Sequence, residues 1–234
     1  MTYRVLDLFC GAGGSAVGLH RAGFEVIGID LVPQPHYPFE FHLGDAMTYP
    51  LEGFDAYWAS PPCQGYSIMR NLPWLRHKVY PLLIDATRER LEATGKPYII
   101  ENVMGAHLAA GWLCGTMFGL PFYRHRAFET NFFWLQPGHP KHRFTISPGR
   151  NLGEREHIVA FTESRARKTG QRYGFDKPEC AVGHAKQAGV SARDTLEVSW
   201  MTRDEATQAI PPIYAEFLGK ALARAVKEAI DGHV

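Results

Sequence analysis

Residues 4–16 read RVLDLFCGAGGSA, an apolar run that passes directly into a glycine-rich turn. The apolar run predicts a buried strand, the glycines predict a tight turn, and the residues through about Ala22 predict a helix. Residues 24–30 (FEVIGID) predict a second strand that ends in a carboxylate. A strand, a glycine turn, a helix and a strand ending in an acid predict a βαβ unit.

The same alternation continues along the chain. Further strands are predicted at residues 55–60, 97–102 and 128–134, and further helices at residues 80–93, 201–208 and 212–230. Alternating strands and helices predict an α/β fold with a doubly wound, mostly parallel sheet. In such a sheet a ligand binds beyond the carboxyl ends of the strands, where the most informative residues of this chain fall.

Composition limits the class of protein. The 234 residues are 45% hydrophobic and 21% charged, which is typical of a globular protein and excludes wholesale disorder. No apolar run is long enough to span a membrane, and the first residues do not resemble a secretory signal. The four cysteines contain no CxxC pair, so we predict no metal site, no disulfide and a reducing, cytoplasmic location.

The net charge of +1 hides an uneven distribution. Residues 139–172 hold 8 Lys/Arg against 3 Asp/Glu, a net charge of +5, whereas the segments before and after each carry −2. This basic block predicts either attraction to a polyanion or a solvated loop. We therefore divide the chain into a catalytic and cofactor-binding domain (1–135), a short basic recognition segment (136–198) and a returning C-terminal helix (199–234).

Two groups of residues indicate a chemical role: the glycine turn with Asp30, and Cys63 with Glu101. Gly11–Ala16 fits the pattern G-x-G-x-x-G/A, and Asp30 follows Gly11 by 19 residues, as expected for a nucleoside-containing cofactor. The alternative is a tight turn with Ser15 as a helix cap. Cys63, held behind two prolines at a strand end, predicts a nucleophile, whereas a lone cysteine elsewhere is usually a buried packing residue. Glu101 at the end of an apolar strand predicts either a partly desolvated acid or a carboxylate in a helix cap or salt bridge.

These motifs, in this order, resemble the DNA (cytosine-5) methyltransferases, including the compact members found in bacteriophages. The glycine turn is similar to their S-adenosylmethionine loop, Pro62-Cys63-Gln64 to their nucleophile motif, and Glu101-Asn102-Val103 to their acid motif. Arg124-His125-Arg126 resembles the end of their Gln-x-Arg-x-Arg motif. The resemblance covers about residues 3–134 and 198–230, and it implies a Rossmann-like methyltransferase fold.

The resemblance implies transfer of a methyl group from S-adenosylmethionine to C5 of a flipped-out cytosine in DNA. Cys63 would add to C6, Glu101 would support that addition at ring N3, and Asn102 would orient the glutamate or the base. Arg124 and Arg126 would hold the base or its phosphate, or brace Glu101. The cofactor-binding residues implied are Phe9, Gly11, Ala12, Gly13, Gly14, Asp30, Leu31, Asp45, Ala46, Pro62, Ala209 and Ile210. We expect a monomer.

The chain departs from the family pattern at three places. Phe122 stands where the arginine motif normally opens with glutamine, and Thr207-Gln208 stand where the last motif carries Gly-Asn. The recognition segment is also much shorter than in most members, which favours a short or loosely specified target.

Four other interpretations stay open. An RNA (tRNA) cytosine methyltransferase would share the chemistry, and a non-catalytic nucleic-acid-binding relative would share the fold. An NAD-dependent oxidoreductase would use the glycine turn but would leave the Cys63 and Glu101 motifs unexplained. The transferred group could also differ from a plain methyl group.

Overall fold

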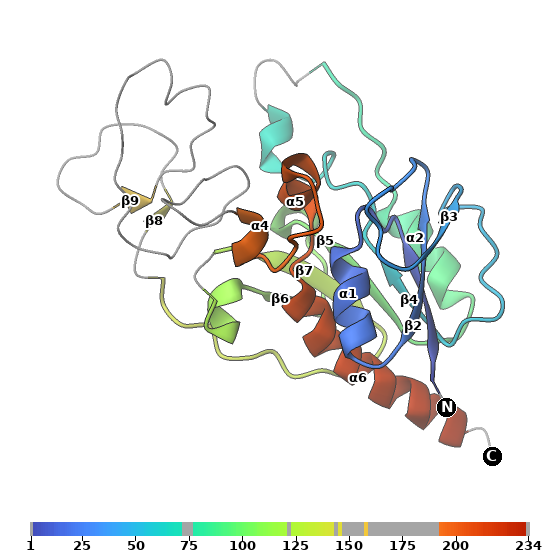
Figure 1. Ribbon diagram of the computed structural model, residues 1–234. Helices are drawn as coiled ribbons and strands as arrows, with labels where there is room; N and C mark the ends of the chain where they lie inside the picture. The colour runs from blue at the N-terminus through green and yellow to red at the C-terminus, as the bar shows by residue number, and fades with distance from the viewer. Residues whose placement is uncertain are drawn as a thin grey trace. The chain divides into compact units, whose positions relative to one another are not determined.

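A seven-stranded sheet organises the larger of two compact units in the computed structural model (Figure 1). The structure describes residues 2–71, 77–120, 123–142, 145–146, 157–158 and 192–232. The larger unit comprises residues 1–113, 125–136 and 209–234, and the smaller unit residues 114–124 and 137–208.

The sheet has the strand order β3-β2-β1-β4-β5-β7-β6. Its strands are β1 (Arg4–Leu8), β2 (Glu25–Asp30), β3 (Glu40–Leu43), β4 (Ala56–Ala59), β5 (Tyr98–Asn102), β6 (Gly111–Leu113) and β7 (Arg126–Thr130). The first five pair in parallel, whereas β7 is antiparallel to both β5 and β6. The chain winds outward from β1 in one direction and resumes at β4 on its other side, so the loops after β1 and β4 meet at a topological switch point.

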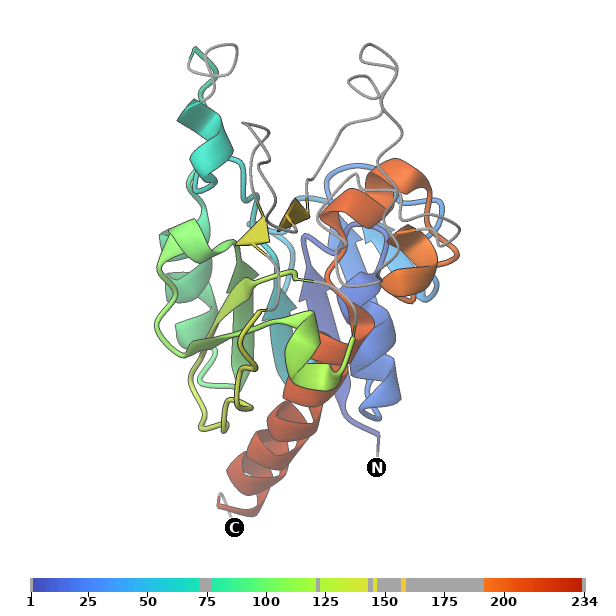
Figure 2. The same ribbon diagram turned by 90° about the vertical axis from the view of Figure 1, so that its left-hand side faces the viewer.

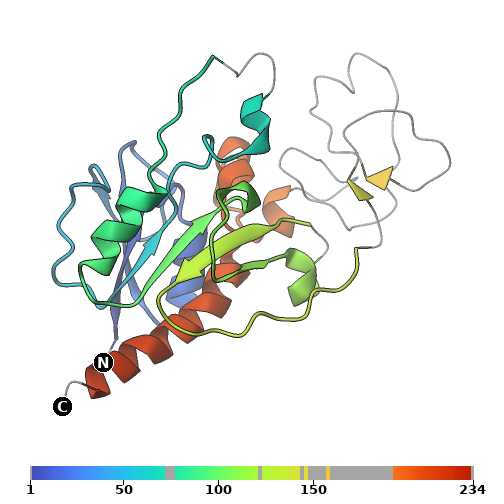
Figure 3. The ribbon, with the colours of Figure 1, turned by 180° about the vertical axis from the view of Figure 1, so that it is seen from behind.

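Helices cover both faces of this sheet. Helices α1 (Gly14–Arg21) and α6 (Pro212–Asp231) pack together on one face, and α2 (Ile84–Glu92) lies on the other (Figures 1 and 3). The side chains of successive strand residues point to opposite faces of the sheet. Tyr57 and Ile100 join the core that includes Leu91 of α2, whereas Trp58 stacks edge-on against Phe128.

Helices α1 and α6 approach closely because glycines lie at their contact. A Cβ atom on Gly18 would stand 2.1 Å from the carbonyl oxygen of Pro212, and one on Gly219 would stand 2.8 Å from the Cβ of Ala22. No larger residue fits at Gly18 without displacing backbone, so the glycine fixes where the C-terminal helix begins relative to α1.

The smaller unit holds only short elements among its described residues. They are η3 (Gly115–Phe118), the parallel pair β8 (Thr145–Ile146) and β9 (His157–Ile158), α4 (Ala192–Thr195) and α5 (Arg203–Gln208). Most of the predicted recognition segment lies outside the described residues. Two further 3-10 turns, η1 (Ile68–Asn71) and η2 (Met104–Ala106), belong to the larger unit.

The predicted α/β fold with a mostly parallel sheet is confirmed, and the differences concern the sheet edges and element bounds. Strands β3 and β6 were not predicted, because β3 is half-exposed and polar and β6 has three residues. The predicted strand at 128–134 is shifted: β7 (Arg126–Thr130) begins two residues earlier and ends four residues earlier than predicted. Helix α2 begins at Ile84 rather than at residue 80, after Pro81. No helix among the described residues is long and apolar enough to cross a membrane.

Candidate active site

The turn after β1 is a rigid, left-handed backbone segment. Phe9, Gly11 and Gly13 have φ angles of 58°, 50° and 82°. A positive φ is strained for a residue such as Phe9 and costs about 1–3 kcal/mol, so the surrounding structure must hold it in place. A Cβ atom on Gly13 would stand 2.7 Å from Cδ of Pro38, which makes this glycine necessary for packing.

Asp30 ties this turn to the end of β2. Its Oδ2 accepts the N–H of Gly11 at 3.0 Å, and its Oδ1 accepts the N–H of Val32 at 3.0 Å. Each carboxylate oxygen has a second lone pair, so Asp30 can bind the turn and still accept a hydroxyl from a ligand. Leu31 beside it is 71% exposed, which is unusual for a leucine and leaves an apolar surface at the strand end.

Other residues that the sequence predicts to bind the cofactor lie around the same strand ends. Asp45 follows β3 and closes a turn, since its Oδ1 accepts the N–H of Met47 at 2.8 Å, and Ala46 is buried. Ile210 approaches the turn from the C-terminal segment: a Cβ atom on Gly14 would stand 2.3 Å from the carbonyl oxygen of Ile210. A glycine is therefore needed at position 14 for packing against Ile210, whether or not a ligand binds.

The space over Gly11 fits a ligand. A Cβ atom on Gly11 would meet nothing within 4 Å, although the residues on either side of the turn are closely packed. Open space over a glycine backbone, the Asp30 carboxylate and the exposed Leu31 together suit a nucleoside with its ribose at the carboxylate.

A buried carboxyl group lies beneath the turn. Asp7 of β1 is fully buried, and its Oδ2 accepts a hydrogen bond from Oγ of Ser15 at 3.0 Å. Burial, with a smaller contribution from the charge of Asp30, raises the pKa of Asp7 from 3.8 to about 8. Ser15 therefore binds Asp7 and does not cap α1, whose cap residue is Gly13.

The loop after β4 holds Cys63 half-buried on a fixed backbone. The carbonyl oxygen of Cys63 accepts the N–H groups of Tyr66 and Ser67, both at 3.0 Å, which closes a turn directly after the cysteine. On the other side, Nδ2 of Asn102 donates to the carbonyl oxygen of Pro61 at 2.9 Å. The backbone that carries Cys63 is thus held on both sides of the cysteine.

Asn102 acts on the protein backbone. It is fully buried, and its Oδ1 accepts the N–H of Val103 at 2.9 Å while its Nδ2 holds Pro61. The sequence predicted that Asn102 orients the glutamate or the base. The structure shows it joining the end of β5 to the Cys63 loop, and the orienting role stays a prediction.

Glu101 pairs with Arg126 across the antiparallel strands β5 and β7. Nε of Arg126 lies 3.0 Å from Oε1 of Glu101, and the two side chains are 17% and 6% exposed. Because little water surrounds the two charges, their attraction holds the carboxylate beside the guanidinium. Arg126 is one of the two arginines that the sequence predicted to brace Glu101.

Arg124 belongs to the smaller unit. It is buried, and its Nη2 donates to the carbonyl oxygen of Thr207 at 2.7 Å. This contact connects the two ends of the unit, which are far apart in sequence. Phe122, which replaces the family's glutamine, lies outside the described residues.

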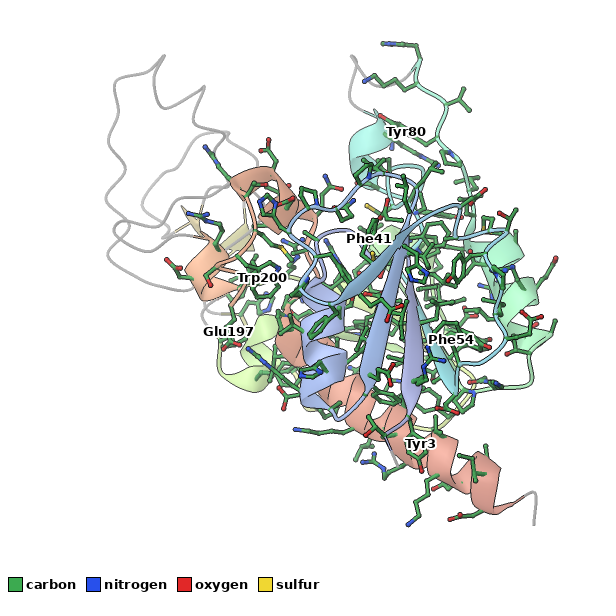
Figure 4. The ribbon with its side chains drawn as sticks, turned by 45° about the vertical axis from the view of Figure 1, so that its right-hand side comes forward. Tyr3, Phe41, Phe54, Tyr80, Glu197 and Trp200 are labelled. Atoms are coloured by element: carbon green, nitrogen blue, oxygen red, sulfur yellow. The ribbon has the colours of Figure 1, made fainter. Side chains whose placement is uncertain are left out.

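A basic hollow adjoins the Cys63 loop. It is lined by Gly65, Arg70, Asn71, Lys78, Tyr80 and Leu82. Nη1 of Arg70 donates to the carbonyl oxygen of Gly65 at 2.6 Å, so the arginine is anchored to the loop. This segment stands out at the carboxyl end of the sheet, with Tyr80 at the opposite end from Tyr3 and Phe54 (Figures 2 and 4).

Comparisons with known proteins find relatives for the N-terminal part of the chain. The family model for the C-5 cytosine-specific DNA methylases matches residues 3–109. Type II methyltransferase M.AquIA of Picosynechococcus sp. is 26% identical over 125 residues, or 45% of this chain and 50% of that protein. Type II methyltransferase M.AplI of Arthrospira platensis is 32% identical over 116 residues, or 43% of this chain and 31% of that protein. The aligned part of the chain spans half or less of these relatives.

Solved structures share the fold over nearly the whole chain. A protein described as a DNA modification methyltransferase encoded within an E. coli prophage has a TM-score of 0.56 at 16% identity, covering 97% of this chain and 100% of its own. The Dnmt2 methyltransferase of S. pombe has a TM-score of 0.55 at 15% identity, with coverage of 98% and 99%. The fold is therefore that of the Rossmann-like methyltransferases, and residues 3–109 are similar to the C-5 cytosine-specific DNA methylases.

Proposed function

We propose that this chain transfers a methyl group from S-adenosylmethionine to C5 of cytosine in DNA. The observation that carries the proposal is one constellation in the larger unit. Asn102 ties the loop of Cys63 to the end of β5, and the neighbouring residue on that strand, Glu101, is held by Arg126. A positioned thiol, a positioned acid and an open glycine turn beside them suit covalent activation of a weakly nucleophilic ring.

Cys63 begins the reaction by forming a bond from its sulfur to C6 of the cytosine. This addition makes C5 nucleophilic, and Glu101 supports it by donating a proton or a hydrogen bond to ring N3. S-adenosylmethionine, when bound, supplies an electrophilic methyl group on a sulfonium sulfur. That methyl group would pass to C5 and leave its bonding electrons on the donor sulfur, a base would remove the C5 proton, and the bond between C6 and Cys63 would break.

The two arginines have different tasks in this proposal. Arg126 keeps the carboxyl group of Glu101 aimed at the base, as its 3.0 Å contact with that group indicates. Arg124 belongs to the other unit, where it holds Thr207, and a contact with the base or its phosphate remains part of the proposal. The cofactor would lie over Gly11, with its ribose at Asp30 and its adenine beside Leu31 and Asp45.

DNA is the substrate that the charge distribution favours. The hollow beside the Cys63 loop presents Arg70 and Lys78, both exposed, as contacts for phosphate. Residues 136–198 include the basic block and form the proposed recognition segment. A base inside a duplex cannot reach Cys63, so the target cytosine must leave the stack.

The test is to read modified cytosines in plasmid DNA from cells that express the protein, at single-base resolution. The wild-type protein should leave C5-methylcytosine in a repeated sequence context, and the Cys63→Ala variant should leave none. Folded wild-type protein that modifies no DNA cytosine, or that modifies RNA alone, would overturn the proposal. Measuring the mass of the modified nucleoside distinguishes a methyl group from a larger one.

A further inference from the structure

A cluster of metal-binding side chains lies within the smaller unit, apart from the residues assigned to catalysis. Cys114, His139 and His142 each offer one ligand atom, and these atoms lie within 4.8 Å of one another. Sequence reasoning predicted no metal site because no CxxC pair is present. His142 is 28 residues from Cys114, so only the fold brings the thiol and the two imidazoles together.

The distances within the cluster match a tetrahedral zinc site. Sγ of Cys114 lies 3.4 Å from Nε2 of His142, and the Nε2 atoms of His139 and His142 lie 2.9 Å apart. Two ligands on one tetrahedral zinc are separated by about 3.6 Å for sulfur and nitrogen, and by about 3.3 Å for two nitrogens, given their usual bond lengths. Small movements of the side chains would accommodate the ion.

The surroundings favour the forms of these side chains that bind a metal. Oγ1 of Thr116 donates to Sγ of Cys114 at 3.3 Å, as a hydroxyl does to a thiolate ligand. Tyr123 stacks flat on His142, with ring centroids 3.8 Å apart and 6° between the planes, so that the imidazole is held in one orientation.

The cluster joins two segments that have little regular structure of their own. Cys114 precedes the η3 turn, and His139 and His142 lie on a stretch without helix or strand that contains Pro140. Short segments with little packed structure, like the described parts of this unit, are the setting in which proteins use a structural metal. Zinc is the metal expected for one thiolate and two imidazoles.

We propose that Cys114, His139 and His142 bind a structural zinc ion that cross-links η3 to residues 137–142. Water or another side chain fills the fourth position. The ion would stabilise the start of the recognition segment and take no part in methyl transfer. This proposal is independent of the proposed function, since none of its ligands belongs to the catalytic constellation.

The first test measures zinc in the purified full-length protein after dialysis against a metal-chelating resin. We expect about one zinc per chain in the wild type, falling to background in Cys114→Ser, His139→Ala and His142→Ala. Cys63→Ala and His107→Ala are matched controls, a half-buried thiol and an exposed imidazole, that should retain the ion. Because Cys63→Ala abolishes the proposed reaction, retained zinc in this variant separates the two proposals.

A second test does not depend on whether the variants fold. The wild-type protein is stripped of metal and titrated with Co²⁺, and its absorption spectrum is recorded. Tetrahedral d–d bands with a thiolate-to-cobalt charge-transfer band, present also in Cys63→Ala, support the site. A wild-type protein that takes up neither Zn²⁺ nor Co²⁺, that binds cobalt without a thiolate band, or that loses no zinc on any of the three substitutions would overturn it.

Discussion

The glycine turn after β1 and the Cys63 loop after β4 lie side by side in the sheet, but they are built differently. The turn is shaped by backbone packing: Pro38 and the carbonyl of Ile210 leave no room for side chains on Gly13 and Gly14. The Cys63 loop is held mainly by polar contacts, through Asn102, and the adjacent acid by Arg126. Substitutions at the packed glycines should therefore damage the fold, whereas substitutions on the other side should damage the chemistry.

Among the substitutions that test how the two regions are held, Glu101→Gln should have the largest effect on activity. The variant keeps the shape of the side chain but loses the acid and its charge pair with Arg126, so kcat should fall about 10²–10⁴-fold. Glu129→Gln is the matched control, because it breaks a half-buried arginine–carboxylate pair of β7, to Nη2 of Arg88 at 2.9 Å. Equal losses of activity in both variants would show that Glu101 has no special role.

Asn102→Ala should reduce the rate without removing a catalytic group. The Pro61 carbonyl would lose its partner and the Cys63 loop its fixed position, which we expect to lower kcat up to about 100-fold. Asn131→Ala provides the control at the other end of β5, where Asn131 accepts the N–H of Tyr98 at 2.9 Å and donates to the carbonyl of Lys96. Steady-state kinetics should show kcat affected by Asn102→Ala alone.

Gly18→Ala tests the packed side of the comparison. Helix propensity alone would stabilise the variant by about 1 kcal/mol. The new Cβ atom would meet the carbonyl of Pro212 at 2.1 Å, so we expect the free energy of unfolding to fall by about 1–3 kcal/mol instead. In Gly44→Ala the nearest atom is Cδ2 of Tyr49 at 3.8 Å, and urea unfolding of that variant should show no comparable loss.

The smallest effect concerns pH and the buried Asp7. Its pKa is raised to about 8 in the folded protein, so folding favours the protonated form. Stability from this group is complete below the unfolded value of 3.8 and is lost as the pH rises through about 8. Asp7→Asn imitates the protonated acid and should lose less stability than the wild type between about pH 6 and pH 9. Melting temperatures of the wild type and Asp7→Asn that change in parallel with pH over that range would contradict the raised pKa of Asp7.

Much of the arrangement of strands and turns around the site could be predicted from the sequence because local patterns determine it. The run RVLDLF, the glycines after it and Asp30 specify a strand, a turn and a strand end within 30 residues. Their places at the carboxyl edge of the sheet follow from parallel pairing. The polar edge strand β3 has no apolar run and could not be recognised in this way.

Contacts between distant segments could not be predicted. Nothing near Asn102 in sequence indicates that its side chain holds the carbonyl of Pro61, 41 residues earlier. The requirement for glycine at Gly14 likewise arises from Ile210, close to the other end of the chain. Such roles depend on the path of the folded backbone, which residue types and spacing do not specify.

Covalent trapping tests the central claim, that Cys63 is the nucleophile, most directly. The protein is incubated with S-adenosylmethionine and with DNA in which 5-fluorocytosine replaces cytosine, because fluorine at C5 cannot leave as the proton does. Peptide mass spectrometry should then find the DNA base attached to Cys63, and no adduct should form in Cys63→Ala. An adduct on another cysteine, or none on folded wild-type protein that binds the DNA, would contradict the account.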